Sequence, residues 1–151
     1  MGQEENLGID QQYLMMQTTI QMYTPKGLYG FLSNPDGKDL YFHLSAFDPG
    51  SYVGDAPVPP IVGEQVEAII ENGKVIQCNR LDTPELKTGV VDWFDSDKGY
   101  GFVAHDGAQI FLHRSEVLEG RLPLKGRRVS FYVSDNTNKQ KRACYVSVLA
   151  D

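Results

Sequence analysis

An internal repeat constrains this chain more than any other feature of its sequence. Residues 18–31, TTIQMYTPKGLYGF, align without a gap on residues 89–102, GVVDWFDSDKGYGF. Further matches place LYFHLS (40–45) on IFLHRS (110–115) and VGEQVEAII (62–70) on KGRRVSFYV (125–133). Self-similarity of this kind indicates two copies of one small unit rather than a single larger domain. A chain of 151 residues is long enough for two such domains.

The domain boundaries are expected to follow this repeat. We predict a lead-in over residues 1–16, a first domain over 17–82, a linker over 83–86 and a second domain over 87–151. Only Asp10–Gln17, where the lead-in meets the first domain, suggests a helix. The Leu-Met-Met segment at 14–16 is interpreted as a short lead-in packed on the first domain, or alternatively as a strip that binds a partner.

Each copy is punctuated like a meander of short strands. In the second copy we predict strands over 89–94, 100–105, 108–113, 128–133 and 142–149, with turns at 95–99, at Asp106-Gly107 and at 134–139. In the first copy Asn72-Gly73 predicts a hairpin between the fourth and fifth strands, and the Pro- and Gly-rich segment 48–63 predicts an exposed loop. The predicted fold class is all-β, with two tandem small five-stranded antiparallel barrels of the OB type.

Aromatic side chains recur at every second position in two of these strands. Tyr100 and Phe102 share one face of a strand, and Phe111 and His113 share one face of the next. One interpretation is that they form the inward face of a barrel. The other is that they lie outside, because a second set of alternating residues can fill the core: Val90, Val103, Ile110, Leu112, Val129, Phe131 and Val133. The second interpretation gives both faces an occupant and is preferred.

The charge of the chain limits how it could bind nucleic acid. The net charge is −6, which argues against binding mainly through the release of counterions. Residues 1–83 carry four basic and eleven acidic side chains, whereas residues 84–151 carry ten basic and nine acidic ones. This asymmetry predicts that the two halves have different electrostatics and different roles.

Other functional classes find little support in the sequence. No apolar run approaches the roughly 20 residues that span a bilayer, and the start of the chain is acidic, so we expect a cytoplasmic protein. Cys78 and Cys144 form no CxxC pair and are interpreted as buried free thiols. We find no phosphate-binding glycine loop, no metal-ligand spacing and no nucleophile with a base, and therefore expect neither an enzyme nor a cofactor.

The second copy resembles the cold-shock domain family. Residues 89–103, GVVDWFDSDKGYGFV, are similar to the first two strands of that family with its RNP1-like motif KGYGFV. Residues 110–114, IFLHR, are similar to its RNP2-like motif. The resemblance covers residues 87–150. It implies a five-stranded barrel that binds single-stranded RNA or DNA by stacking bases on an aromatic surface.

The resemblance also implies which residues bind nucleic acid. By motif position they are Trp93, Phe94, Lys98, Tyr100, Phe102, Phe111, His113 and Arg114. The chain departs from the family at Asp92, where lysine is usual, at Asp95, where asparagine is usual, and at Arg114, where an aromatic residue is usual. The two aspartates are expected to weaken binding near the first turn, whereas the arginine plane can still stack on a base.

The first copy resembles the same family less closely. It keeps four aromatic or histidine positions, namely Tyr29, Phe31, Tyr41 and His43. Met22 stands in place of the tryptophan, Gly27 in place of the lysine, and Leu28 in place of the first glycine of the KGYGF motif. Together with the acidic balance of this half, these changes predict weak nucleic-acid binding or none. Alternatively, this copy could dock on the other half, on a second chain or on another protein.

The sequence thus favours a single-strand nucleic-acid binder, and the resemblance to the cold-shock family implies that it acts as an RNA chaperone or a regulator at the transcript level. The alternative is a protein-interaction or dimerisation module whose acidic first domain and PVPP segment (57–60) bind a protein partner. His113 as a metal ligand or catalytic base is not favoured, because no second ligand or nucleophile lies nearby in the sequence. The remaining basic residues are interpreted as a solvated surface or, alternatively, as guides for a phosphate backbone: Arg127, Arg128, Lys139, Lys141 and Arg142.

Overall fold

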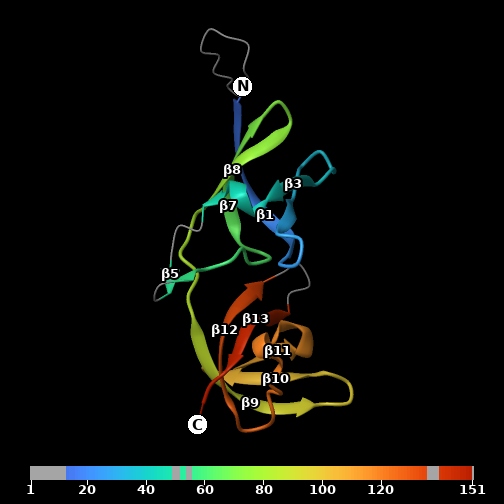
Figure 1. The fold of residues 1–151 in the computed structure, drawn as a ribbon, viewed down its shortest axis with the longest axis vertical. Coiled ribbons are helices and arrows are strands. Elements are labelled where there is room, and N and C mark those ends of the chain that lie inside the picture. The colour runs from blue at the N-terminus through green and yellow to red at the C-terminus, as the bar shows by residue number, and fades with distance from the viewer. Residues whose placement is uncertain (1–12, 49–51, 54–55, 136–139, 151) are drawn as a thin grey trace. The chain divides into compact units, whose positions relative to one another are not determined.

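The chain divides into two compact units, Met1–Thr83 (unit 1) and Pro84–Asp151 (unit 2). The computed structural model describes residues 13–48, 52–53, 56–135 and 140–150 (Figure 1). The expected helix over Asp10–Gln17 falls partly outside these residues, and Lys139 lies outside them altogether. The described residues form strands and three short 3-10 helices, and none of them is in an α-helix.

The strands of unit 1 are β1 (Tyr13–Thr24), β2 (Tyr29–Leu32), β3 (Leu40–His43), β4 (Phe47–Asp48), β5 (Tyr52–Val53), β6 (Ala56–Pro57), β7 (Gln65–Glu71) and β8 (Lys74–Arg80), with η1 (Leu44–Ala46) after β3. Those of unit 2 are β9 (Lys87–Asp95), β10 (Tyr100–His105), β11 (Ala108–His113), β12 (Arg128–Asp135) and β13 (Lys141–Val148), with η2 (Arg114–Glu116) and η3 (Leu118–Gly120) after β11. The predicted all-β fold is confirmed.

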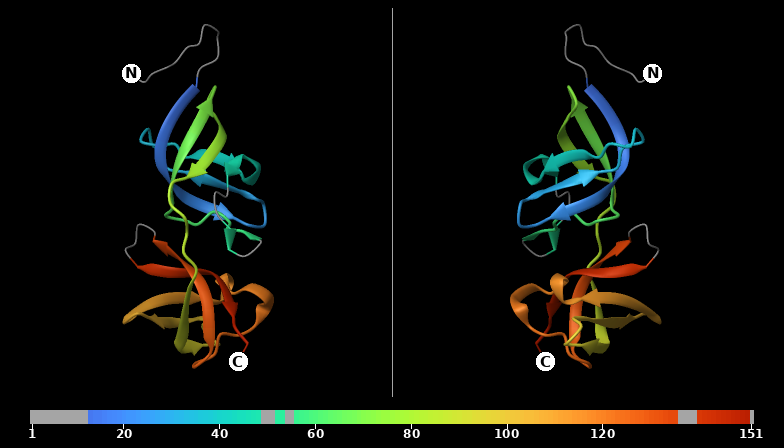
Figure 2. Two further views of the ribbon diagram at one scale, coloured as in Figure 1. Left: turned by 90° about the vertical axis from the view of Figure 1, so that its left-hand side faces the viewer. Right: turned by 90° about the vertical axis from the view of Figure 1, so that its right-hand side faces the viewer.

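Unit 2 is a closed barrel with the strand order β10-β11-β13-β12-β9 (Figure 2). Its pairs are antiparallel except at the closure, where Phe111 of β11 pairs in parallel with Arg142 of β13. Asp106 and Gly107 both have positive φ, 51° and 79°, as a tight turn between twisted strands requires. The nine-residue core consists of Val91, Val103, Ile110, Leu112, Val129, Phe131, Ala143, Val146 and Val148.

One expected core position of unit 2 is wrong. Val90 is 44% exposed, and its neighbour Val91 is buried in its place. The reason is a β-bulge, because Phe102 pairs with Trp93 whereas Val103 pairs with Val91, so that β9 contains one extra residue at this point. A bulge shifts the alternation of side chains along a strand, which simple alternation cannot reveal.

Unit 1 repeats this arrangement but closes differently. Its sheet has the order β3-β2-β1-β7-β8-β4, and the short strand β4 runs parallel to β8, with Phe47 opposite Cys78. Unit 2 has only an isolated parallel bridge, between Val117 and Val146, at the equivalent place. Among the described residues of unit 1, no ladder joins β3 to β8. The sheet of unit 1 therefore curls around its core without the closing pair of unit 2.

The start of β1 differs from the expectation. The strand begins at Tyr13, and Tyr13–Thr19 pair with β7. The helix suggested over Asp10–Gln17 is therefore wrong for its described part, because these residues add to the antiparallel sheet. Met16 packs against the core of unit 1, whereas Leu14 and Met15 are exposed.

The segment expected to be an exposed loop is largely buried from Val58 to Ile61. Val58 is 2% exposed and Ile61 is 6% exposed. Arg80 holds this segment, since its Nη1 donates to the Val58 carbonyl at 2.8 Å and its Nη2 to the Pro59 carbonyl at 2.9 Å. The same guanidinium forms a two-pronged ion pair with Glu64, and its Cζ lies 4.8 Å from the centre of the Phe47 ring. Sequence patterns alone could not predict this set of contacts.

Both cysteines are buried thiols, as predicted. Burial, reinforced by the negative charge of Glu64, raises the pKa of the Cys78 thiol to about 12. The described residues contain no group of three or more His, Cys, Asp or Glu side chains that could hold a metal ion. In the same part of the chain, no helix has the length and hydrophobicity needed to cross a membrane.

Candidate nucleic-acid interface

The bulge in β9 determines which side chains reach the outer face of the unit 2 barrel. Because Asp92 is the extra residue, both Asp92 and Trp93 are exposed, although they are neighbours in the chain. The first unit has the same bulge, where Ile20 pairs with Leu32 but Met22 pairs with Phe31. Gln21 and Met22 are accordingly exposed together. Both units therefore present two successive residues of their first strand beside the aromatic positions.

Four rings meet on the outer face of unit 2, and we call them the unit 2 ring cluster: Trp93, Tyr100, Phe102 and Phe111. They come from three adjacent strands, because Phe102 pairs with Trp93 on one side and with Phe111 on the other. Neighbouring ring centres lie 5.6–5.9 Å apart. Trp93 is 39% exposed and the other three are half-buried. None belongs to the barrel core.

Close packing of the backbone supports this cluster. A Cβ atom at Gly101, between Tyr100 and Phe102, would lie 2.0 Å from the carbonyl oxygen of Trp93. Only glycine fits this approach of β10 to β9, which explains the glycine between the two aromatic residues. The residue is also inward-facing and buried, so that both flanking rings lie on the outer side.

Phe94 lies on the other side of the strand. It is half-buried and packs against the barrel core. The resemblance placed it among the binding residues, and in this structure it is not part of the ring cluster. Its position follows from the alternation that resumes after the bulge, which turns Trp93 outward and Phe94 inward.

His113 continues the ring row at the end of β11. Its ring centre lies 6.5 Å from that of Phe111. The His113 Nδ1 accepts a hydrogen bond from the backbone N–H of Ser115 at 3.1 Å and thereby caps η2. His43 makes the same contact with Ser45 at 3.0 Å in unit 1. Because the Nδ1 lone pair accepts this hydrogen bond, Nε2 is the ring nitrogen that can contact a ligand.

The turn between β9 and β10 contains Asp95, which was expected to weaken binding, and Lys98, which was expected to bind nucleic acid. Arg114, also expected to bind, contacts the same turn. The Asp95 carboxylate accepts hydrogen bonds from the backbone N–H groups of Asp97 and Lys98, at 2.9 and 3.1 Å. Lys98 is exposed. Arg114 Nη2 donates to the carbonyl of Ser96, which ties the start of η2 to this turn. Asp95 thus forms the turn as asparagine can, and Arg114 braces it.

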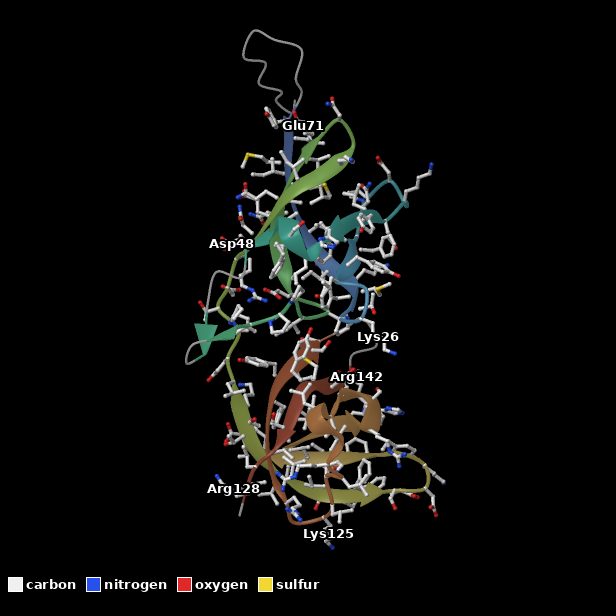
Figure 3. The ribbon with its side chains drawn as sticks, viewed as in Figure 1. Lys26, Asp48, Glu71, Lys125, Arg128 and Arg142 are labelled. Carbon is white, nitrogen blue, oxygen red and sulfur yellow. The ribbon has the colours of Figure 1, made fainter. Side chains whose placement is uncertain are left out.

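One of the five basic residues that the sequence offered as possible guides for a phosphate backbone, Arg142, lies at the edge of the ring cluster. Arg142 lies on β13 opposite Phe111, and its Cζ is 5.3 Å from the centre of the Phe111 ring (Figure 3). Burial raises the pKa of the Glu116 carboxyl, while Arg142, the backbone N–H of Tyr145 and His113 oppose that shift. The pairing of β11 with β13 that closes the barrel brings Arg142 beside the rings. The position of Arg142 therefore depends on the strand topology and has no local sequence signal.

Unit 1 carries a smaller version of the same cluster, which we call the unit 1 ring cluster: Tyr29, Phe31 and Tyr41. Their centres lie 5.7–6.1 Å apart, and Tyr41 is 53% exposed. Met22 takes the place of the tryptophan beside Phe31 and is 37% exposed. Leu28 has a φ of 60°, close to the value of 81° at Gly99, its counterpart. The turn therefore keeps its geometry without the glycine.

Unit 2 also matches a protein family by sequence. The family profile described as 'Cold-shock' DNA-binding domain matches residues 87–149. The "Cold shock-like protein" of Aquifex aeolicus is 42% identical over 67 residues, which cover 42% of this chain and 94% of that protein. The chain belongs to the cold-shock domain family. The recognition made from the two motifs is confirmed.

Other similar proteins extend the family comparison. The "Protein lin-28" of Caenorhabditis elegans is 37% identical over 82 residues, which cover 51% of this chain and 36% of that protein. This chain of the cold-shock family therefore spans about a third of the length of that relative. Among solved structures, "drosophila Unr CSD456" covers 90% of this chain and 61% of its own, at 16% identity and a TM-score of 0.41.

Proposed function

We propose that this cold-shock protein binds single-stranded RNA or DNA by stacking bases on its exposed rings, with unit 2 as the main site. The observation that carries the proposal is the unit 2 ring cluster on the outside of a barrel that is already filled. Stacking on aromatic side chains is worth about 1–3 kcal/mol per base and tolerates any base, because every base has a π-face. Four rings could therefore provide affinity in a protein of net charge −6.

The cations of unit 2 fit the same proposal. Arg142 beside Phe111, and Lys98 in the neighbouring turn, offer positive charge at two borders of the ring cluster. Phosphate contacts position a strand, whereas the rings hold its bases. The proposed cellular role is RNA chaperoning or regulation at the transcript level in the cytoplasm, because rings that hold single strands compete with base pairing. Neither role requires catalysis.

The experiment is a fluorescence titration that uses Trp93, the only tryptophan of the chain. A short single-stranded oligonucleotide is added at moderate salt, and the same sequence as a duplex serves as the control. Saturable quenching by the single strand alone is the expected result, because a stacked base perturbs the indole. An unchanged emission at micromolar protein and excess oligonucleotide would rule out stacking on unit 2.

A second candidate function concerns unit 1, which could bind a protein. Its described strands expose Met15 (59%) and Ile76 (42%), two apolar side chains on β1 and β8. Among the described residues, β4 pairs with β8 only at Cys78 and Asn79, so that Lys74–Gln77 pair with β7 alone. Exposed apolar residues and an open strand edge are features of surfaces to which other chains add. Sedimentation of the isolated protein would reveal self-association through this surface.

A further inference from the structure

Beside each ring cluster, a carboxylate and an amide meet on the outer face. In unit 2 Gln109 Nε2 donates to Asp92 Oδ2 at 2.5 Å. Asp92 is the extra residue of the β9 bulge, and Gln109 stands two positions before Phe111 on the same face of β11. Ala104 of the intervening strand pairs with Gln109, and its small side chain leaves room for the contact. All three residues are exposed.

Unit 1 has the same pair with its two members exchanged. Gln21 aligns with Asp92, and Asp39 aligns with Gln109. Gln21 Nε2 donates to Asp39 Oδ2 at 3.4 Å, and the Gln21 carbonyl oxygen accepts a hydrogen bond from Ser33 Oγ. A carboxylate and an amide therefore recur at one place in both units, although the residue at each position differs. The exchange indicates that the common feature of the two surfaces is the carboxylate–amide pair and not the residue type at either position.

The hydrogen-bonding capacity of this pair is one-sided. An ionised carboxylate accepts only, and an amide offers one carbonyl acceptor and two N–H donors. In unit 2 one of those N–H groups already points at Asp92. What remains for a ligand is the second carboxylate oxygen, the Gln109 carbonyl and a single N–H. The surface next to the rings is therefore rich in acceptors and negatively charged.

We propose that this carboxylate–amide pair favours bases with an exocyclic amino group, cytosine and adenine, over uracil and thymine. Cytosine N4 and adenine N6 carry N–H donors, whereas uracil and thymine present the carbonyl oxygen O4 at the corresponding position. An oxygen facing Asp92 is repelled, and an amino group is bound. The inference rests on the proposed function, because it requires a base stacked on Trp93, Phe102 or Phe111 with its edge toward the pair.

The test compares two oligonucleotides that differ only in the pyrimidine, since cytosine carries the N4 amino group and an N3 acceptor, whereas uracil carries O4 and an N3–H donor. The octamers dC8 and dU8 have the same backbone and length, and they are titrated at pH 7.5 and fixed salt with Trp93 emission as the signal. This signal reports unit 2, where the only tryptophan lies. We expect dC8 to bind about tenfold more tightly than dU8, the lower part of the range for a well-formed contact to a base edge.

Two matched variants assign the preference to the pair. Asp92→Asn removes the charge and some acceptor capacity from an exposed residue with little change of shape, and it should bring the dC8 to dU8 ratio close to one. Asp135→Asn removes the same charge from an exposed residue on β12, whose ion pair with Lys141 spans 3.9 Å. This control should change both affinities equally and leave their ratio unchanged. Thermal unfolding of each variant verifies that the barrel is intact.

Each outcome decides a separate point. Equal binding of dC8 and dU8 by the unmodified protein would overturn the inference and leave the proposed function standing. A preference that survives Asp92→Asn would overturn the assignment to the pair. Failure of both octamers to change the emission would overturn the proposed function together with the inference.

Discussion

The two units resemble each other more in their backbone features than in their side chains. The bulge at Gln21 and Asp92, the left-handed residue at Leu28 and Gly99, and the capping histidine occur in both. The differences include the tryptophan, which is replaced by Met22, and the strand pairing that closes the barrel in unit 2 but not among the described residues of unit 1. This comparison teaches that the outer face is maintained by bulges and turns, so that a ring cluster can persist after individual motif residues have changed.

The charge of the two units also requires a local description. Residues 1–83 are strongly acidic, yet on β1 to β3 and their turns Lys26 and Lys38 balance Asp36 and Asp39. Glu71 lies at the end of β7, away from the turn that carries Lys26 (Figure 3). The acidity of the first half therefore does not describe its ring-bearing face. Met22 in place of a fourth ring is the clearer reason to expect weaker binding by unit 1.

The largest expected effect concerns a difference in the interactions that stabilise each unit internally. Arg80 is 2% exposed and bonds Glu64 and two carbonyls, whereas the equivalent position in unit 2 is Val148, a core residue. Arg80→Ala leaves the Glu64 carboxylate buried without its partner. We expect unit 1 to lose about 3–5 kcal/mol of stability. Calorimetry should show the unit 1 transition shifted down, while the Trp93-monitored transition of unit 2 stays in place.

A double variant sharpens this test. Replacing both members, Arg80→Leu with Glu64→Leu, removes the unpaired charge and should recover part of the loss, because a buried ion pair can be exchanged for apolar side chains at little cost. The Val58 and Pro59 carbonyls still lose their donor, so recovery should be incomplete. A single variant as stable as the unmodified protein would show that Arg80 does not hold this loop.

The next effect compares the two ring clusters directly. Phe102→Ala removes the central ring of unit 2 and should weaken binding of a single-stranded octamer by about 1–3 kcal/mol. Phe31→Ala, at the equivalent place in unit 1, should change it little, because that cluster has three rings and no tryptophan. Fluorescence anisotropy with a labelled octamer measures both. Equal losses would show that unit 1 contributes as much as unit 2, and a loss of stability instead of affinity would place these rings in the core.

A smaller effect concerns the turn before each ring-bearing strand. Leu28 has a φ of 60°, which strains a residue with a side chain, and it is 44% exposed. Leu28→Gly should stabilise unit 1 by about 0.5–1 kcal/mol, the strain relieved less the extra flexibility of glycine in the unfolded chain. The converse change in unit 2, Gly99→Ala, should destabilise it. Urea unfolding measures both, and a loss of stability on Leu28→Gly would mean that the leucine side chain contributes packing that outweighs the strain.

The sequence allowed the strands of unit 2 and its turn at Asp106-Gly107 to be predicted, because alternation and turn residues are local signals. It also pointed to the aromatic positions that meet as rings. It did not predict the exposure of Val90 or the inward position of Phe94, since both depend on a bulge. The Arg80 contacts and the approach of Arg142 to Phe111 depend on closure between distant strands. No local pattern contains that information.

The smallest effect concerns Glu116 of unit 2, whose counterpart in unit 1 is Ala46. Burial raises the pKa of Glu116 above its value in the unfolded chain, so the ionised carboxylate costs the folded state stability. The native form is favoured while the carboxyl is protonated, and this advantage is lost as pH rises through the folded pKa. Glu116→Gln removes the titrating group and should make unit 2 more stable at pH 7, by under about 1 kcal/mol because the site is partly solvated. The difference from the unmodified protein should shrink as pH falls and the carboxyl becomes protonated in both the folded and the unfolded chain, when measured by Trp93-monitored unfolding. The unit 1 transition serves as the internal control, and a less stable variant at pH 7 would show that the attraction of Arg142 for Glu116 outweighs burial.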